Sequence, residues 1–392
     1  MLSVTRLLTG TATPGDALRY GRLTGDMPAH LLHFSADKKP IVVWNLTRRC
    51  NLSCMHCYSD SHDEAYGGEL TTREGKALLD DLAEFGVPTV LFSGGEPLTR
   101  PDLFELAAYA RDRGLRCILS TNGTLITPEA ARKIQSCGFS YVGVSLDGVG
   151  PVHDKIRGKK GAYDAALAGL RLCRDLGTRV GLRFTVHKRN LDELPAAFDL
   201  LETEDIPRCC VYHLAYAGRG ERLRRHDLEP AETREVVEEI FDRAQEQVRR
   251  GVRMEVLTVD NPVDNVLLLM RVRRIEPERA VEVEQLLRWN GGNQSGIAIA
   301  CVDPQGRVHP DQFSWHHTVG HVREERFGEI WTDANPALRP YRQRPRPVRG
   351  RCDGCRFFDL CNGGLRVRAE SAAGDPTAPD PACYLTDEEI AA

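Results

Sequence analysis

The sequence predicts an α/β fold in which parallel strands alternate with helices, followed by a small cysteine-rich domain. Short apolar runs recur between residues 41 and 214, and a segment with helical periodicity lies between each pair of them. Such alternation is typical of a parallel sheet whose strands are connected by helical crossovers. Four further cysteines lie between residues 352 and 383, after this pattern has ended.

Six strands are expected in the first part of the chain. They are residues 41–46, 87–92, 116–120, 141–146, 180–186 and 209–214. Thr71 and Glu74 have the spacing of a capping box and predict the start of the first helix. Pro101 and Pro128 fit the first turns of the next two helices. Six strand–helix units are too few to close an eight-stranded barrel.

On this pattern the chain divides into four regions. Residues 1–40 form an N-terminal extension, residues 41–260 the α/β domain, residues 261–290 a helical bridge, and residues 291–392 the cysteine-rich domain. This last domain is expected to begin with a hairpin, because Pro304 and Gly306 suit the second and fourth positions of a type I turn.

Composition narrows the possible functions. A hydrophobic content of 41% and a charged content of 28% are typical of a globular protein, and a net charge of −4 gives no general attraction to nucleic acid. No apolar run approaches the length of a membrane span, and residues 1–22 lack a signal pattern, so a cytoplasmic protein is expected. Thirteen cysteines in such a chain indicate metal binding rather than disulfides.

Three of these cysteines lie within eight residues, directly after the first expected strand. Cys50, Cys54 and Cys57 form the pattern CxxxCxxC. Three thiolates can hold three irons of a [4Fe–4S] cluster and leave the fourth iron open to another ligand. Zinc is the alternative, but structural zinc prefers four ligands, and His56 lies between two of the cysteines, where it cannot easily join them.

This motif, with an imidazole just before the third cysteine, resembles that of the radical S-adenosylmethionine (SAM) superfamily. The resemblance implies an open partial (β/α)6 barrel in which the cluster binds SAM and cleaves it to a radical that abstracts hydrogen from a substrate. It also implies an electron donor such as flavodoxin or ferredoxin. A non-enzymatic iron–sulfur electron carrier is the competing class, but it would leave the polar motifs at the strand ends without a purpose.

Those motifs follow the expected strands, at the edge of a parallel sheet where ligands bind. The sequence Gly94-Gly95-Glu96 resembles the family's GGE motif, which holds the amino group of SAM, and Arg183 is a candidate for its carboxylate. Asn122 and Asp147 could equally cap helices. The residues predicted to bind SAM are Gly94, Gly95, Glu96, Asn122, Ser145, Asp147 and Arg183.

The C-terminal cysteines suggest a second cluster. Cys352, Cys355, Cys361 and Cys383 supply four thiols, enough for a closed cluster site, and a zinc ribbon is the alternative. They resemble the SPASM or twitch extension of radical SAM enzymes, which implies an auxiliary [4Fe–4S] cluster. Cys301 has too few partners for a third site. The other five are expected to pack as small apolar residues: Cys117, Cys137, Cys173, Cys209 and Cys210.

Nearly the whole chain resembles the tetrapyrrole-modifying radical SAM enzymes, through stretches within residues 16–22, 43–52, 212–220, 308–326 and 350–385. One branch removes two acetate side chains of 12,18-didecarboxysiroheme to give iron-coproporphyrin III. Another makes the d-type haem of nitrite reductase from the same precursor. The N-terminal extension and residues 37–40 favour the first. A SPASM peptide maturase would need a recognition domain larger than the 40 residues before the barrel.

An iron tetrapyrrole substrate would need partners for its carboxylates and its iron. Arginine pairs carboxylates with two parallel hydrogen bonds, and imidazole is an axial ligand of haem iron. Two arginine clusters are candidates for the carboxylates: Arg219, Arg222, Arg224 and Arg225, and Arg342, Arg344, Arg346, Arg349 and Arg351. One of four histidines is expected to bind the iron: His213, His309, His316 or His317.

Overall fold

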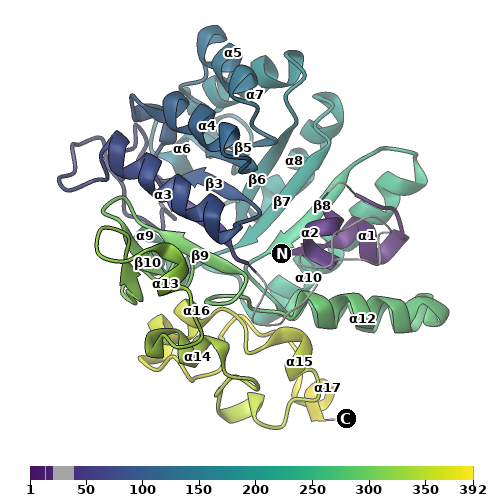
Figure 1. The fold of residues 1–392 in the computed structure, drawn as a ribbon. Coiled ribbons are helices and arrows are strands. Elements are labelled where there is room, and N and C mark those ends of the chain that lie inside the picture. The colour runs from purple at the N-terminus through teal and green to yellow at the C-terminus, as the bar shows by residue number, and fades with distance from the viewer. Residues whose placement is uncertain (14, 21–38, 392) are drawn as a thin grey trace.

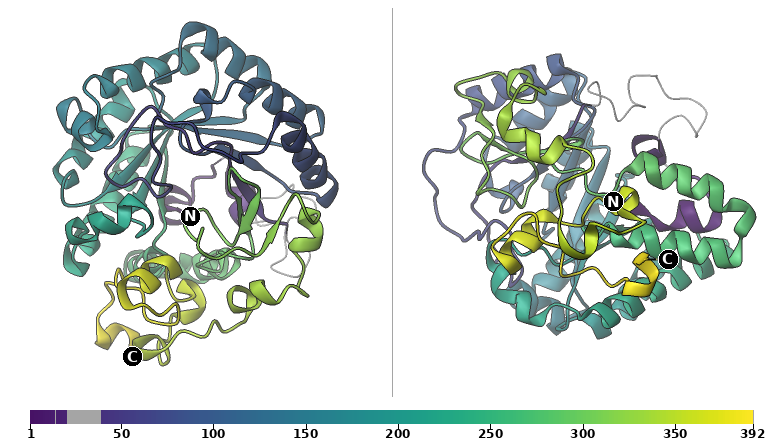
Figure 2. Two further views of the ribbon diagram at one scale, coloured as in Figure 1. Left: turned by 90° about the vertical axis from the view of Figure 1, so that its left-hand side faces the viewer. Right: turned by 90° about the horizontal axis from the view of Figure 1, so that it is seen from below.

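One curved sheet of 11 strands forms the frame of the protein, in the order β1-β8-β7-β6-β5-β4-β3-β2-β9-β10-β11. The computed structural model, which describes residues 1–13, 15–20 and 39–391, shows helices on the outside of this sheet and the C-terminal region across its open side (Figures 1 and 2). Strands β2 to β8 all run parallel to one another. The predicted α/β partial barrel is confirmed.

The observed elements follow the predicted ones closely. The parallel strands are β2 (Ile41–Asn45), β3 (Val90–Ser93), β4 (Cys117–Thr121), β5 (Tyr141–Ser145), β6 (Val180–Val186), β7 (Arg208–His213) and β8 (Glu255–Val259). The helices along them are α3 (Thr72–Phe85), α4 (Leu103–Asp112), α5 (Pro128–Cys137), α6 (Pro151–Arg157), α7 (Ala162–Asp175), α8 (Leu194–Thr203), α9 (Arg219–Leu223) and α10 (Pro230–Arg249). The predicted capping box opens α3, and α4 begins two residues after Pro101.

Successive side chains of each strand point to opposite faces of the sheet, so one set packs in an outer core and the other faces an inner lumen. On β2, for example, Val42 and Trp44 pack against the outer helices, whereas Val43 faces the lumen. On β6, Leu182 and Phe184 are fully buried in the same outer core, and Arg183 faces inward. The lumen side of the barrel is therefore free to carry polar groups.

Strand β8 was not expected, because it lies in a charged stretch that predicts helix. Its first residue, Glu255, is nevertheless buried and paired with arginines. The predicted hairpin is present as β9 (Ile299–Val302) and β10 (Arg307–His309), with β11 (Gly320–His321) beside it. Because β9 pairs in parallel with β2, the hairpin extends the barrel sheet instead of opening a separate domain at residue 291.

The described part of the N-terminal extension packs against the barrel, as predicted. It contains β1 (Leu2–Ser3), which pairs with β8, then α1 (Val4–Thr9) and α2 (Asp16–Tyr20). Much of the extension lies outside the described residues. So do residues 37 and 38, part of the stretch that favoured the branch removing acetate side chains.

Helices α11 (Val263–Ile275) and α12 (Ala280–Asn290) occupy the region that was expected to be a helical bridge. The last 70 residues form short elements: α13 (Phe327–Ile330), α14 (Arg339–Arg342), α15 (Phe358–Cys361), α16 (Arg366–Ala373) and α17 (Asp387–Ala391). Within the described residues, none of the helices is long and apolar enough to cross a membrane.

Candidate active site

The loop that follows β2 carries the first three cysteines at the C-terminal edge of the sheet. Cys50 and Cys54 are buried, and Cys57 is partly buried. Arg219 of α9 fastens this loop, because its guanidinium donates to the Cys54 carbonyl at 2.7 Å and lies 2.9 Å from the Asp60 carboxylate. Burial, followed by the nearby Cys54 thiol, raises the pKa of Cys50 to about 12. Metal binding at this thiol must therefore displace a proton.

Two N–H donors face these sulfurs. The Asn122 amide nitrogen lies 3.9 Å from the Cys50 sulfur, and Arg157 Nη1 lies 3.5 Å from the Cys54 sulfur. Hydrogen bonds to sulfur tune an iron–sulfur cluster, and a cation beside it stabilises its negative charge. In the described residues no fourth cysteine lines this cavity. Three thiols with such neighbours fit a [4Fe–4S] cluster with one open iron better than structural zinc, which takes four ligands.

The two glycines after β3 bring that strand end against the cysteine loop. The N–H groups of Gly95 and Glu96 donate to the carbonyls of Thr47 and Arg49 at 2.7 and 2.8 Å. A Cβ on Gly94 would lie 2.4 Å from the Thr47 oxygen, and one on Gly95 would lie 2.3 Å from the Arg49 oxygen. Only glycine permits this approach, and both glycines line the cavity beside the cysteines.

Glu96 does not line the cavity, which corrects the prediction that its carboxylate holds the amino group of SAM. The side chain is fully buried. Its carboxylate accepts hydrogen bonds from the Leu98 N–H, the Thr121 hydroxyl and the Asn122 N–H at 3.0, 2.8 and 2.7 Å. Glu96 therefore ties together the ends of β3 and β4, which position Gly94, Gly95 and Asn122.

Asp147, which was also predicted to bind SAM, is fully buried and does not line the cavity. Its carboxylate pairs with Arg157 at 2.5 Å, accepts from the Thr185 N–H at 2.8 Å and lies 3.4 Å from His56 Nε2. Burial by itself would raise the pKa of Asp147, but Arg157 and His56 hold it below its usual value. Burial lowers the pKa of His56 to about 3, so this imidazole is neutral. Asp147 thus orients the guanidinium beside Cys54.

A cavity of about 160 Å³ joins these groups at the C-terminal ends of the strands. Five of the seven residues predicted to bind SAM line it: Gly94, Gly95, Asn122, Ser145 and Arg183. The Arg183 guanidinium donates to the Ser120 hydroxyl and lies over the Tyr212 ring at 4.8 Å. Arg183 and Tyr212 also line a deeper cavity of about 280 Å³, which continues down the lumen.

The four histidines predicted to bind iron all direct Nε2 at a carboxylate. His213 lies 2.9 Å from Asp264 and lines the cavity beside the cysteines. His309 is fully buried, with Nε2 at 3.3 Å from Asp303 and Nδ1 at 3.0 Å from the His317 carbonyl. His316 and His317 each lie 2.9 Å from Glu370, on the surface of the C-terminal region. The structure brings only His213 of these four into the cavity wall.

The two predicted arginine clusters do not reach the cavity. Arg219 holds the cysteine loop, and Arg224 donates to the Ser371 carbonyl. In the second cluster, Arg346 is buried and contacts Asn293, whereas Arg351 donates to the carbonyls of Cys383 and Leu385. These guanidiniums are used to fold the protein, so any carboxylate partners must be sought elsewhere.

The four C-terminal cysteines meet at one site, as predicted. Cys352, Cys355, Cys361 and Cys383 line a small cavity together with Phe357, Phe358, Leu385 and Ile390. Burial, followed by the nearby thiols of Cys383 and Cys352, raises the pKa of Cys361. Four thiols around one apolar pocket fit a fully ligated cluster. Cys301 is remote from them, buried between Asn45 and Trp315, with the Asn45 amide 3.2 Å from its sulfur.

Four of the other five cysteines pack in the outer core, as expected: Cys117, Cys137, Cys173 and Cys209. Cys210 is the exception, because strand alternation turns it into the lumen, where it packs with Tyr212, Leu257 and Val259. All 13 cysteines have free thiols.

Several residues of this site were not expected from the sequence. Arg157 contacts a cysteine sulfur, Thr185 and Tyr212 line the cavity, and Asp260 lies in the walls of both lumen cavities. Asp260 follows β8 with a φ of 68°, which is unusual for a residue other than glycine. The signal that could have located Arg157 is its place on a short helix directly after the motif that contains Asp147.

Comparisons with known proteins agree with this geometry. A model of the radical SAM superfamily matches residues 44–201. Fe-coproporphyrin III synthase of Methanosarcina barkeri is 54% identical over 394 residues, covering 100% of this chain and 99% of that protein. Pre-heme d1 synthase of Dinoroseobacter shibae is 44% identical over 353 residues, covering 90% of this chain and 87% of that protein.

Solved structures show the same fold at low sequence identity. Streptococcus suis SuiB bound to S-adenosylmethionine has a TM-score of 0.71 and 16% identity, covering 88% of this chain and 78% of that one. The fold and the three-cysteine site together define an enzyme that uses an iron–sulfur cluster and SAM. The chain belongs to the radical SAM superfamily. When bound, the [4Fe–4S] cluster and SAM supply a 5′-deoxyadenosyl radical.

Proposed function

We propose that this enzyme removes the two acetate side chains of 12,18-didecarboxysiroheme to give iron-coproporphyrin III. The observation that carries this proposal is the 54% identity to Fe-coproporphyrin III synthase along the entire chain. The lumen supports it, since an apolar wall of Ile41, Leu91 and Ile118 leads to several cationic side chains. A tetrapyrrole is an apolar ring with carboxylate arms, so it matches an apolar wall that ends in cationic side chains.

For SAM we propose a place between the three cysteines and the ends of β3, β4 and β5. Gly94 and Gly95 offer backbone to its amino group, while Asn122 and Ser145 lie within reach of its sugar in the same cavity wall. Arg157 is better placed than Arg183 for its carboxylate, because Arg157 is the guanidinium beside a cluster sulfur. Arg183 is then free to contact a ligand in the deeper cavity.

Of the four histidines proposed for the substrate iron, we retain His213. It lies in the cavity wall, and Asp264 would orient its ring as a carboxylate orients a metal-binding imidazole. Asp264 also accepts from the Tyr384 hydroxyl at 2.8 Å, next to Cys383. The absorption spectrum of the iron porphyrin complex tests this role, since an unchanged Soret band in His213→Ala would exclude it.

The second cysteine site is proposed to hold an auxiliary [4Fe–4S] cluster that exchanges electrons with the active site. Reduction of the first cluster requires an external donor, for which we propose flavodoxin or ferredoxin. Such donors and 13 free thiols fit a reducing cytoplasmic compartment.

The assay that tests the proposal uses anaerobically purified enzyme with reconstituted clusters, a reductant, SAM and 12,18-didecarboxysiroheme. Mass spectrometry should show the loss of both acetate arms together with 5′-deoxyadenosine. Formation of 5′-deoxyadenosine with an intact tetrapyrrole would reject this substrate while retaining the enzyme class. The 44% identity to pre-heme d1 synthase supports a second candidate, production of the d-type haem precursor, which the same product masses distinguish.

A further inference from the structure

Basic side chains line the part of the barrel lumen that lies nearest the N-terminal ends of the strands, here called the lower lumen. The deeper cavity has an apolar middle, and four basic side chains lie in its wall toward the N-terminal ends of the strands: Arg19, Lys39, Arg116 and Arg208. A fifth, Arg183, lies farther up, level with Ser145, and lines both this cavity and the one beside the cysteines. Asp260 is the one carboxylate of the described residues in that wall. Such an excess of positive charge inside a protein is costly unless an anion compensates it.

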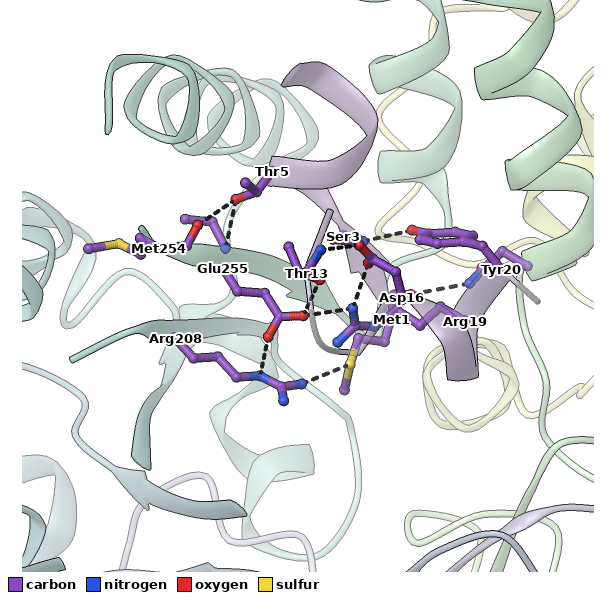
Figure 3. Close-up of polar contacts among 12 residues, drawn as sticks. Met1, Ser3, Thr5, Thr13, Asp16, Arg19, Tyr20, Arg208, Met254 and Glu255 are labelled. Carbon is purple, nitrogen blue, oxygen red and sulfur yellow. Dashed lines mark hydrogen bonds and ion pairs between the residues drawn. The ribbon is translucent and has the colours of Figure 1, made fainter. Parts of the chain in front are cut away.

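One buried carboxylate compensates part of this charge. Glu255 of β8 lies 2.8 Å from Arg19 and 3.4 Å from Arg208 (Figure 3). It also lies 3.2 Å from Arg179. The Thr13 hydroxyl also donates to it at 2.8 Å. This network attaches the N-terminal segment to the bottom of the barrel and, of the basic side chains in the cavity wall, accounts for Arg19 and Arg208 by folding alone. The Lys39 ammonium lies over the Phe85 ring, 3.7 Å from its centroid.

Arg116 and Arg183 are not accounted for in this way. Arg116 donates from Nε to the Ser140 hydroxyl at 3.1 Å, and Arg183 donates to the Ser120 hydroxyl. In the part of the chain that the structure describes, neither the Arg116 nor the Arg183 guanidinium has a carboxylate within 4.0 Å, the greatest separation of an ion pair. Burial, followed by the charges of Arg179 and Arg208, lowers the pKa of Arg116. Arg116 therefore stands among like charges.

A buried hydroxyl in the same wall also lacks a partner. Tyr141 is 6% exposed, and its hydroxyl makes no hydrogen bond to any described residue. The ring occupies space that two glycines leave open, since a Cβ on Gly181 would lie 2.3 Å from the hydroxyl and one on Gly143 would lie 3.1 Å from the ring. An unpaired donor in the lumen indicates an acceptor on the ligand.

We propose that the deeper cavity is the subsite for the carboxylate arms of the substrate, with Arg116 and Arg183 as their ion-pair partners and Tyr141 as a hydrogen-bond donor. This inference rests on the proposed function, because it takes the ligand to be an iron tetrapyrrole. Arg116 directly precedes β4 and Asn122 directly follows it at the cluster end, so the two lie roughly 20 Å apart at about 3.3 Å per residue. The ring then lies in the apolar middle of the lumen, between the cluster and the basic end.

The test compares two iron porphyrins by absorption titration of the cluster-loaded enzyme. Iron coproporphyrin carries four carboxylates, and iron octaethylporphyrin carries none. Arg116→Gln should weaken binding of the first by roughly tenfold or more, as expected for a hydrogen bond to a charged group, and leave the second unchanged. Tyr141→Phe should act in the same direction with a smaller effect. Arg225→Gln, an exposed arginine outside the cavity, is the matched control and should match the wild type.

Thermal unfolding without porphyrin gives a second measurement. Removing an unpaired charge from among like charges should leave the stability of Arg116→Gln equal to or above that of the wild type. The inference is overturned if this variant binds iron coproporphyrin as tightly as the wild type, or if it loses both porphyrins equally. A wild-type enzyme that binds neither porphyrin would instead contradict the proposed function, and the two failures are thereby separated.

Discussion

Two groups of cysteines lie in different parts of the molecule, and their surroundings differ. Cys50, Cys54 and Cys57 border a cavity of about 160 Å³ whose wall carries hydroxyl, amide and guanidinium groups. The other four border a cavity of about 20 Å³ lined mainly by aromatic and aliphatic side chains. The first site has space and polar groups for a ligand beside the metal, whereas the second is filled by the protein. This difference supports the proposal that the chemistry takes place at the first site and that the second exchanges electrons.

The largest effect should come from removing one thiol at each site. Cys54→Ala removes a ligand from the cluster that binds SAM, so reductive SAM cleavage should fall below detection. Cys361→Ala should retain 5′-deoxyadenosine formation and lose only the iron of the second cluster. Iron content and 5′-deoxyadenosine by mass spectrometry measure both. Equal loss of SAM cleavage in the two variants would show that the sites are not functionally distinct.

The next effect concerns the ion pair beside the first cluster. Arg157→Gln leaves the fully buried Asp147 without its charged partner, which should cost about 3–5 kcal/mol in the free energy of unfolding. Arg171→Gln is the control, since its pair with Glu204 is half exposed and contributes about 0–1 kcal/mol. Denaturant unfolding measures both. A double variant, Arg157→Gln with Asp147→Asn, should recover part of the loss; no recovery would assign the effect to packing.

Two carboxylates, one at each site, should respond to pH in opposite directions. Burial raises the pKa of Asp260 to about 6, above its usual 3.8. Its contribution to stability is therefore fully present at low pH and is lost as the pH rises through about 6. Asp260→Asn should match the wild type near pH 4 and exceed it by up to about 3 kcal/mol at pH 8.

At the second site, Asp380 pairs with the fully buried Arg368 at 2.7 Å, and this guanidinium outweighs burial to hold the pKa of Asp380 low. Asp380→Asn should therefore lower stability at pH 8, the reverse of Asp260→Asn. Melting temperatures of the wild type and both variants at several pH values measure this. A stabilised Asp380→Asn would contradict the assignment of that ion pair.

Local patterns explain why the sequence predicts some of these features and not others. CxxxCxxC, the Thr71–Glu74 capping box and the six apolar strands are each specified by residues close together in the chain. The structure confirms the capping box and the strands, and it brings the three cysteines to one cavity. Glu96 and Asp147 were misassigned, because their partners, such as Thr121 and Arg157, come from other elements. A motif shows which residues gather at a strand end but not which side chain faces the ligand.

The unexpected β8 has a similar explanation. Glu255 would not ordinarily begin a buried strand, and it does so because Arg19, Arg179 and Arg208 approach it from distant parts of the chain. The two arginine clusters that were predicted to bind the substrate carboxylates do not reach the cavity, for the converse reason. Their guanidiniums are close in sequence but bind backbone carbonyls in different places, while the arginines that share the lumen come from separate elements.

The smallest effect should come from the apolar wall of the second site. Ile390 is 8% exposed, so truncation in Ile390→Ala should cost about 2 kcal/mol, near the lower end for a buried aliphatic residue. Water admitted beside the auxiliary cluster favours its more negatively charged reduced form, so its reduction potential should become more positive. Potentiometric titration followed by electron paramagnetic resonance measures this shift, and the first cluster serves as an internal control. An unchanged potential at the second site would mean that its apolar lining does not control solvent access, and the contrast between the two sites would then depend on thiol number alone.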